Sequence, residues 1–576
     1  MTFRRSALCV ALAAACLSLH VGAQVRPPMR YDAVQDREPR AEPTLPSLGA
    51  AGTSFFDPVF SSQLWRVTDA ATRPNTPNRS YRTPSGTHQN AWSADSAYFY
   101  VVSTDGTVIP FAFDPATERA RRIEADGASE GGLVLRFYNE PHFSYTRPGV
   151  IYGSASGSGA TLRTIDAYDF SRNAYERILD LDQLVPGLAG TYVGGIGSSS
   201  GDPERLITFF GGVSQDRHRY VAVFDRQNTS RRRLVDTVAS TIDGRPTNIT
   251  LNFRLHHAFI DRSGRYALLY PTSGDRQAPR NAAPVYLWDI DGGTFSELPS
   301  IAARSNGHDT YGYAVMVNQD CCTTTTWDAA QWQFRRLDAP MATRDLISPI
   351  VQPKSVYLAE HPSWHNARPD TLTPFVTALY RYGANDVPWR AWDDEIVGVE
   401  TAADGGATVW RFAHHRSDVR HDDDPVRIGF WYTPRPNVSS DGRYVLFTSN
   451  WEKRLGTDPA GETGTKYRQD VFLLKLRPAD GTRAGDENAE PIEILTQVLP
   501  SARRTVPYST ILEASGGGGA LQWRLERGSL PPGLQLNRAT GEIAGTARST
   551  GTWLFTAGVT DGRSNDRRSF SLTVRR

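Results

Sequence analysis

Short apolar runs alternate with clusters of turn-forming residues along most of this chain. The alternation is clearest in three related phrases, AWSADSAYFYV at residues 91–101, AFIDRSGRYALLY at 258–270 and NVSSDGRYVLFTS at 437–449. In each phrase a polar turn leads into an alternating or fully apolar strand. Almost no window has the spacing of an amphipathic helix, so the pattern predicts an all-β protein.

The recurrence of the phrase indicates repeated modules, because a supersecondary unit repeated along a chain buries the apolar faces of its neighbours. Several apolar strands are followed by an outer strand after an Asp-containing turn, as in FAFDPATERARRI at 111–123 and YLWDIDGGTFSEL at 286–298. Such pairs are typical of the hairpins in propeller blades. With roughly 40–50 residues per blade, we expect residues 55–476 to form a β-propeller of about seven blades.

The first residues have the features of a secretory signal. Arg4 and Arg5 precede an apolar run and a small-residue cleavage site, so residues 1–23 are expected to be removed when the protein is secreted or exported to the periplasm. Residues 24–54 are rich in Pro, Arg and Glu without apolar periodicity, which predicts a disordered lead-in. No later stretch reaches the roughly 18 apolar residues of a membrane helix, so we expect no transmembrane segment.

The charges of the chain are balanced, with 63 Lys and Arg against 62 Asp and Glu. This balance gives no reason to expect a nucleic-acid partner, and it leaves the oligomeric state open. Two of the four cysteines, Cys9 and Cys16, belong to the predicted signal. The remaining pair, Cys321 and Cys322, is too few for a disulfide-stapled scaffold.

The pattern changes near the C-terminus. Residues 477–506 gather Asp, Glu, Ala and Pro and predict a linker. Beyond it, LPPGL at 530–534, ATGEI at 539–543 and Gly-Thr at 545–546 resemble the immunoglobulin-like, or dystroglycan-type cadherin-like, module of bacterial secreted proteins. The resemblance implies a small Ig-like β-sandwich at 507–576 that acts as an adhesion or spacer module. Some relatives bind calcium, but this copy ends in VTDGRSNDRRS with few clustered carboxylates, so calcium is not expected here.

Histidines recur close to the repeated phrases. His88 precedes the first phrase, His257 stands at the start of the second, and His142 lies in the related stretch EPHFSYTRPGVIYG. Inner strands of propeller blades begin around one mouth of the central channel, so we expect these side chains to share a site. A structural role explains each histidine singly, whereas a cluster with a phenol and a guanidinium suits a carboxylated sugar. The predicted catalytic residues are His88, His142, Tyr145, Arg254 and His257.

A second group combines imidazoles with thiols, in GHD at 307–309, in the Cys321–Cys322 pair and in HPSWH at 361–365. Such nitrogen and sulfur ligands suit a structural zinc ion. The spacing matches no standard zinc motif, and two alternatives stay open: a vicinal disulfide, or thiols that are free or buried. The predicted zinc ligands are His308, Cys321 or its neighbour, His361 and His365.

The predicted propeller resembles the secreted lyases of the oligogalacturonate and ulvan type, which cleave uronate polysaccharides on a seven-bladed scaffold. The resemblance rests on RVTDA from Arg66, HQNAWSADSAYFYV from His88, the GHD and HPSWH motifs, and NVSSDGRYVLFTSNW leading to RQDVFLLKL. Where oligogalacturonate lyases have a His-x-His metal pair, this chain has Arg435-Pro436-Asn437. The ulvan-type arrangement, a catalytic histidine, tyrosine and arginine set with a separate zinc, fits the chain better.

The resemblance implies β-elimination, which needs a cation for the uronate carboxylate, a base for the neighbouring proton and an acid for the leaving oxygen. Candidates for these roles are His142, Tyr145 or Tyr138, and Arg254, backed by His88 and His257. We therefore expect a secreted polysaccharide lyase. The alternative is a non-catalytic propeller that binds glycan or protein while the Ig-like module attaches it to a surface, because propellers host both roles.

Overall fold

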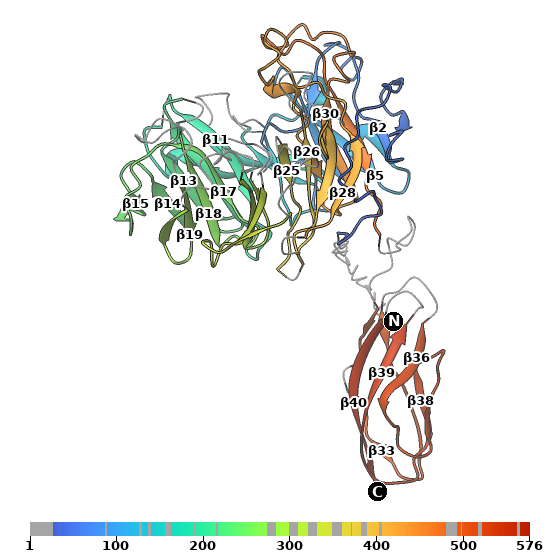
Figure 1. Ribbon diagram of the computed structural model, residues 1–576. Helices are drawn as coiled ribbons and strands as arrows, with labels where there is room; N and C mark the ends of the chain where they lie inside the picture. The colour runs from blue at the N-terminus through green and yellow to red at the C-terminus, as the bar shows by residue number, and fades with distance from the viewer. Residues whose placement is uncertain are drawn as a thin grey trace, which may run out of the picture. The chain divides into compact units, whose positions relative to one another are not determined.

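The computed structural model shows an all-β chain that divides into two compact units, one of Val25–Thr482 and one that contains Arg483–Arg576 (Figure 1). The structure describes residues 27–576 except 87–88, 126–128, 136–139, 156–162, 189, 215–216, 273–283, 299–308, 321–330, 348–359, 370, 382–388, 403–405, 480–491, 497, 516–520 and 561–564. No helix in the described residues has the length and apolar character needed to cross a membrane.

The larger unit contains seven antiparallel sheets within the described ranges, which we number along the chain. Sheet 1 joins β1 (Ser54–Phe56) and β2 (Gln63–Arg66) to β31 (Asp470–Lys475), β30 (Tyr444–Ser449) and β29 (Asn437–Val438). Sheet 2 is β3 (Tyr81–Arg82), β4 (Tyr98–Ser103), β5 (Val108–Asp114) and β6 (Arg119–Arg122). Sheet 3 is β7 (His142–Phe143), β8 (Val150–Gly153), β9 (Thr164–Asp169) and β10 (Ala174–Asp180).

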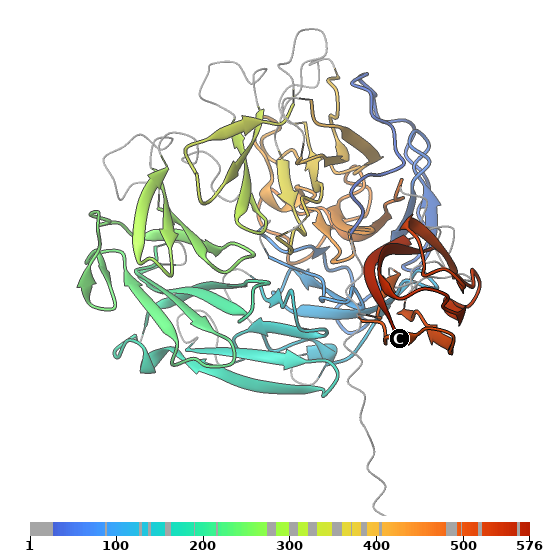
Figure 2. The same ribbon diagram turned by 90° about the horizontal axis from the view of Figure 1, so that it is seen from below.

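The remaining sheets continue in chain order, as Figure 2 shows by their colours. Sheet 4 is β11 (Tyr192–Ser198), β12 (Arg205–Gly212), β13 (Tyr220–Asp225), β14 (Arg232–Asp236), β15 (Thr241–Ile242) and β16 (Arg245–Pro246). Sheet 5 is β17 (Leu255–Ile260), β18 (Tyr266–Pro271), β19 (Val285–Asp289) and β20 (Thr294–Leu298). Sheet 6 is β21 (Thr310–Tyr311), β22 (Val315–Asp320), β23 (Gln331–Arg336) and β24 (Thr343–Asp345). Sheet 7 is β25 (Glu360–Ser363), β26 (Phe375–Leu379), β27 (Glu395–Val399) and β28 (Val409–His414).

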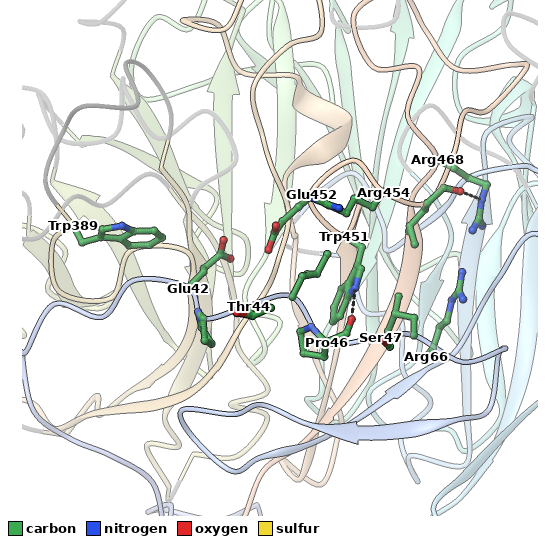
Figure 3. Close-up of a pocket in the computed structure, with 14 residues that line it drawn as sticks. Glu42, Thr44, Pro46, Ser47, Arg66, Trp389, Trp451, Glu452, Arg454 and Arg468 are labelled. Carbon is green, nitrogen blue, oxygen red and sulfur yellow. Dashed lines mark hydrogen bonds between the residues drawn. The ribbon is translucent and has the colours of Figure 1, made fainter.

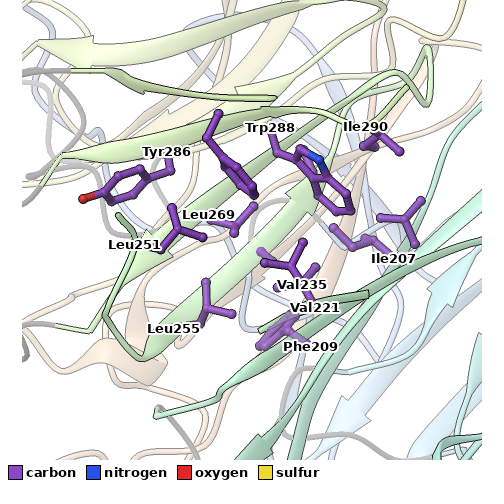
Figure 4. Packing of buried hydrophobic residues seen from close by; sticks show 14 of the residues in the cluster. Ile207, Phe209, Val221, Val235, Leu251, Leu255, Leu269, Tyr286, Trp288 and Ile290 are labelled. Carbon is purple, nitrogen blue, oxygen red and sulfur yellow. The ribbon is translucent and has the colours of Figure 1, made fainter. Parts of the chain in front are cut away.

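The fully apolar strands arise because both faces of a sheet are buried. In β18, Leu268 and Tyr270 point into a core shared with sheet 6, whereas Ala267 and Leu269 point into a core shared with sheet 4. Side chains alternate between the two faces of a strand, so a strand between two neighbours carries apolar residues at every position. Figure 4 shows the core between sheets 4 and 5, where Trp288 and Tyr286 pack above Val221 and Phe209.

The same arrangement links every sheet to the next. Apolar cores join sheets 1 and 2, 2 and 3, 3 and 4, 4 and 5, 5 and 6, and 6 and 7. A further core joins sheet 7 back to sheet 1 through Trp410, Phe412, Val445 and Phe447. The packing order of the seven sheets is therefore cyclic.

The repeated phrases form the turns that precede β4, β18 and β30. The carboxylate of Asp261 accepts hydrogen bonds from the backbone of Ser263 and Tyr266, and Asp441 does so from Arg443. Short polar side chains that bond to the backbone two residues on are typical of such turns. The turns also join neighbouring sheets, because the Ser440 hydroxyl donates to the carbonyl of Ser93.

Both ends of the larger unit meet in sheet 1, where β2 pairs antiparallel with β31. The buried Asp470 carboxylate holds this junction together through ion pairs of 2.6 Å to both Arg66 and Arg468. Arg66 belongs to the RVTDA motif and Arg468 begins RQDVFLLKL, so these two motifs meet in one sheet.

The predicted disordered lead-in is packed from residue 27 onward. Tyr31 is 3% exposed, and its ring lies edge-on to Trp410 at 5.6 Å between ring centroids. Asp36 forms an ion pair with Arg411 at 2.7 Å, and the Trp451 indole donates to the carbonyl of Pro46. We call residues 27–48 the strap. Its composition has no period of its own because its contacts are with sheets 1 and 7, far away in the sequence.

The C-terminal unit consists of a four-stranded sheet, β33 (Ala502–Arg503), β40 (Asn565–Arg575), β39 (Gly551–Thr560) and β36 (Gln522–Gly528), and of a three-stranded sheet, β34 (Pro507–Ile511), β38 (Glu542–Thr546) and β37 (Leu534–Leu536). A short ribbon pairs β32 (Glu493–Ile494) with β35 (Ala514–Ser515). Their core includes Trp523, Phe555 and Phe570. Strands β32 and β33 lie inside the predicted linker, so the module begins earlier than residue 507.

The LPPGL motif closes this unit tightly. Gly533 has a φ of +97°, and a Cβ there would lie 2.1 Å from the carbonyl oxygen of Thr546. Only glycine combines a positive φ with so close an approach of backbone. The motif is therefore explained by the geometry of the turn before β37.

Candidate functional site

Four side chains from three sheets converge in the larger unit. We call them the His–Tyr–Arg cluster: His142 in β7, Tyr145 in the β7–β8 connection, Arg262 after β17 and His365 after β25. The Tyr145 ring lies edge-on to His142 at 5.3 Å and to His365 at 5.0 Å between centroids. The guanidinium carbon of Arg262 lies 3.9 Å from the centroid of the same ring. Tyr145 is thus the centre of the cluster.

The cluster is shielded from water, with exposures of 1% for His142, 2% for Tyr145, 4% for Arg262 and 5% for His365. Burial, with a smaller contribution from Arg262, lowers the pKa of His365 to about 3. His365 is therefore neutral at neutral pH. Its buried Nε2 has no hydrogen-bond partner among the described residues.

The other members differ from His365 in protonation. Burial raises the pKa of Tyr145 to about 12, so Tyr145 keeps its phenolic proton at neutral pH. Burial also lowers the pKa of Arg262. The Nδ1 of His142 accepts a hydrogen bond of 3.2 Å from the backbone N–H of Asn90, which places the proton of a neutral ring on Nε2. A neutral base, a phenol and a guanidinium therefore lie in one cluster.

A second buried network lies near Arg262. The Tyr270 hydroxyl contacts both the carboxylate of Asp309 and the hydroxyl of Tyr311. Burial, together with Asp309, raises the pKa of both tyrosines well above the usual range. Asp309 belongs to the GHD motif, in which His308 and not Asp309 was the predicted site residue.

The predicted site residues separate in the structure. His142 and Tyr145 lie together as expected, and His365, predicted as a metal ligand, joins them. His257 instead stacks on His256 at 4.1 Å between ring centroids. Arg254 is half-buried before β17, and its carbonyl accepts the backbone N–H of Thr272.

The predicted zinc site cannot be assembled from the described residues. Of the predicted zinc ligands, His308 and Cys321, with its neighbour Cys322, lie outside them, as do the catalytic candidates His88 and Tyr138. His361 stacks on Tyr380 at 5.8 Å between ring centroids, whereas His365 contacts Tyr145. No group of three or more His, Cys, Asp or Glu suited to a metal occurs in the described parts of the chain. Zinc therefore stays a prediction.

Arg262 belongs to the cluster although the sequence pattern did not predict it as a site residue. It stands in the turn of the second repeated phrase, at the position that Ala94 and Ser440 occupy in the other two. A turn position is usually exposed and polar, so an arginine there indicates no functional role. The usable signal was a large cation where the related turns have a small residue.

A cavity of about 870 Å³ lies elsewhere in the unit, between the strap and sheet 1 (Figure 3). It holds none of the predicted site residues. In Figure 3 the carboxylates of Glu42 and Glu452 point toward one another. Burial raises the pKa of Glu42 to about 7, Arg416 opposes the rise and Glu452 adds to it. The cavity therefore lies where the strap packs on the unit, and no residue of the His–Tyr–Arg cluster lines it.

Comparisons with known proteins identify one part of the chain. No curated protein matches it. Among solved structures, the chain is similar to a Bacteroides fragilis protein described as "a putative alpha-galactosidase", with 23% identity over 14% of this chain and 17% of that one and a TM-score of 0.14. The chain thus spans under a fifth of that protein's length.

Two other solved structures align more broadly. Kuenenia stuttgartiensis hydrazine synthase aligns over 64% of this chain and 94% of that one, at 10% identity and a TM-score of 0.35. A fungal alcohol oxidase of the AA5 family aligns over 91% of this chain and 97% of that one, also at 10% identity and with a TM-score of 0.35. TM-scores this low assign neither fold nor function. Residues 491–575 match the family model described as "Putative Ig domain", which confirms the Ig-like module of the C-terminal unit.

Proposed function

We propose that the larger unit is a seven-bladed β-propeller and that its His–Tyr–Arg cluster cleaves acidic polysaccharide by β-elimination. The cyclic packing of seven sheets and the pairing of β2 with β31 support the propeller. The convergence of sheets 3, 5 and 7 on Tyr145 supports a site at the centre of the ring. The signal sequence and the Ig-like module suit an exported protein that works on surface or extracellular glycan.

The roles follow from the protonation of each group. Arg262 binds the uronate carboxylate, because a guanidinium pairs with carboxylate in a planar, two-pronged way. His365 accepts the proton from the carbon beside the carboxylate. The electron pair of that C–H bond forms a carbon–carbon double bond as the bond to the leaving oxygen breaks. Tyr145 donates its phenolic proton to that oxygen, and transfer of the captured proton from His365 to Tyr145 restores both groups.

Two causes lower the pKa of His365 in the free protein: burial is the larger one and the charge of Arg262 is the smaller one. A carboxylate that pairs with Arg262 offsets only the smaller cause, whereas burial continues to lower the pKa of His365. The observation that carries the proposal is the contact of one phenol with both a neutral imidazole and a guanidinium.

The test is the ultraviolet absorbance of the conjugated, unsaturated uronate product, measured with the full chain on a panel of uronate polysaccharides. We expect the absorbance to rise with the wild type. With Tyr145→Phe we expect the rate of this rise to be about 10²–10⁴-fold lower. The matched control is Tyr467→Phe, whose ring is 36% exposed.

The outcomes separate the lyase from the alternative. Loss of product in Tyr145→Phe but not in Tyr467→Phe supports elimination at the cluster. If no polysaccharide of the panel gives unsaturated product although calorimetry detects binding, the lyase proposal is wrong and the unit is a glycan-binding propeller.

A further inference from the structure

A second, partly buried cluster lies beside the His–Tyr–Arg cluster. We call it the arginine–tryptophan cluster: Arg82 in β3, Glu140 before β7, and Trp431 and Arg435 in the connection from β28 to β29. The guanidinium carbons lie 4.4 Å (Arg82) and 5.3 Å (Arg435) from the Trp431 ring centroid. Arg82 also forms an ion pair of 2.6 Å with Glu140.

The charges of this cluster do not balance. Arg435 is 1% exposed, and its two terminal nitrogens donate to the carbonyls of Phe430 and Trp431. Its Nε has no hydrogen-bond partner, and no carboxylate lies within ion-pair distance of it in the described part of the chain. Glu140 is engaged by Arg82 and by Ser85. Two guanidiniums therefore share one carboxylate.

An unpaired buried cation is unfavourable in a folded protein, because burial removes its hydration without supplying a counter-charge. Burial, with the repulsion of Arg82, lowers the pKa of Arg435 to about 9, so the side chain is still charged at neutral pH. The missing counter-charge points to an anionic ligand.

Aromatic rings lie next to the unpaired cation. Phe430 is 46% exposed and packs edge-on against Trp431 at 5.0 Å between centroids. An exposed ring beside a guanidinium offers an apolar face for a sugar ring and a charge for its acidic group. This combination suits an acidic sugar better than a free inorganic anion.

The two clusters share two stretches of chain. Glu140 and His142 are two residues apart, so their Cα atoms are at most about 7 Å apart. In sheet 7, His361 contacts Phe430 at 6.0 Å and His365 contacts Tyr145. A polysaccharide bound at Tyr145 therefore brings a neighbouring sugar near Arg435.

We propose that the arginine–tryptophan cluster is a second subsite, which binds the carboxylate or sulfate ester of a neighbouring sugar while Phe430 and Trp431 pack on its ring. This inference rests on the proposed function for the kind of polymer. It narrows the substrate class to polymers with acidic groups on neighbouring sugars.

Calorimetry tests the subsite with the full chain in a Tyr145→Phe background, so that no ligand is cleaved. The probes are tetragalacturonate, a chondroitin sulfate tetrasaccharide and neutral cellotetraose. We expect Arg435→Gln to weaken binding of an acidic probe at least about tenfold. The matched control, Arg427→Gln, removes the same charge from an exposed position and should leave affinity unchanged.

The probes distinguish the sources of the anion. Dependence on Arg435 for tetragalacturonate indicates a carboxylate, and dependence only for the sulfated probe indicates a sulfate ester. Equal affinities of wild type and Arg435→Gln for both acidic probes, or cellotetraose binding as tightly as they do, would overturn the subsite. Trp431→Ala provides a second variant if Arg435→Gln does not fold. We expect it also to weaken binding of an acidic probe at least about tenfold.

A structural role predicts a different result. A purely structural Arg435 would lower the melting temperature when replaced and leave affinity unchanged, whereas we expect the melting temperature of the free protein to stay level or rise. The test also distinguishes failure of the subsite from failure of the proposed lyase activity. If binding depends on Arg435 but no unsaturated product forms, the subsite proposal stands and the elimination proposal is wrong.

Discussion

The two clusters differ in how their charge is balanced. In the His–Tyr–Arg cluster a single guanidinium faces a phenol and a neutral imidazole, which can both exchange protons. In the arginine–tryptophan cluster two guanidiniums face one carboxylate and aromatic rings, none of which accepts a proton at neutral pH. Burial alone therefore does not define a reactive site. Neutral groups beside a cation favour proton transfer, and an excess of cation favours holding an anion.

The largest effect should come from the centre of the first cluster. We expect Tyr145→Phe to lower kcat about 10³-fold with little change in KM, because the phenol acts on the leaving oxygen and not on the bound carboxylate. Steady-state kinetics on the best polysaccharide of the panel measures this. An equal loss in Tyr467→Phe would contradict the assignment.

The second effect concerns the counter-charge in the arginine–tryptophan cluster. Glu140→Gln leaves both guanidiniums unpaired, so the free energy of unfolding should fall by about 3 kcal/mol. Acidic oligosaccharide should restore part of this stability by binding the unpaired cations. Chemical denaturation with and without tetragalacturonate measures both. No loss of stability would show that Arg82 does not depend on Glu140.

The third effect should be the mirror image of the first. Arg435→Gln should raise KM about tenfold and leave kcat nearly unchanged, because the side chain holds a sugar outside the reacting bond. The same kinetic assay measures this, with Arg427→Gln as the control. If Arg435→Gln instead lowered kcat as much as is expected for Tyr145→Phe, Arg435 would belong to the catalytic site and not to a separate subsite.

The smallest effect should be that of pH. In the free protein His365 is unprotonated above about pH 3 and Tyr145 is protonated below about pH 12. Both groups are in their working forms between these values, and Arg435, with a pKa of about 9, keeps its charge up to about pH 8. We therefore expect kcat/KM, which reports on the free enzyme, to be flat from about pH 5 to about pH 8. A bell-shaped profile inside this range would assign the proton transfers to other groups.

The sequence predicted the elements that local patterns determine. The repeated phrases contain the apolar strands β4, β18 and β30, and the LPPGL and ATGEI motifs marked the Ig-like module. His142 and Tyr145 lie on one short segment, so their meeting was predictable. In each case the signal comes from a spacing of a few residues.

Contacts between distant segments left no such signal. Tyr31 of the strap donates a hydrogen bond to the carbonyl of Gly442, 411 residues away. Arg262 meets Tyr145 only because sheets 3 and 5 approach one another. In the sequence, Arg435 stands out only because it occupies the place of a metal-binding pair in oligogalacturonate lyases. Such partners become visible when the order in which the sheets pack is known.

The junction in sheet 1 also sets the order in which the chain assembles. Arg66 and Asp470, which join β2 to β31, are 404 residues apart. The edge of β2 that pairs with β31 therefore stays open until almost the whole larger unit has been synthesised. Pairing across so long a separation folds slowly and leaves an open strand edge exposed to other chains. We expect a chain shortened before β31 to aggregate rather than to fold with an incomplete sheet 1.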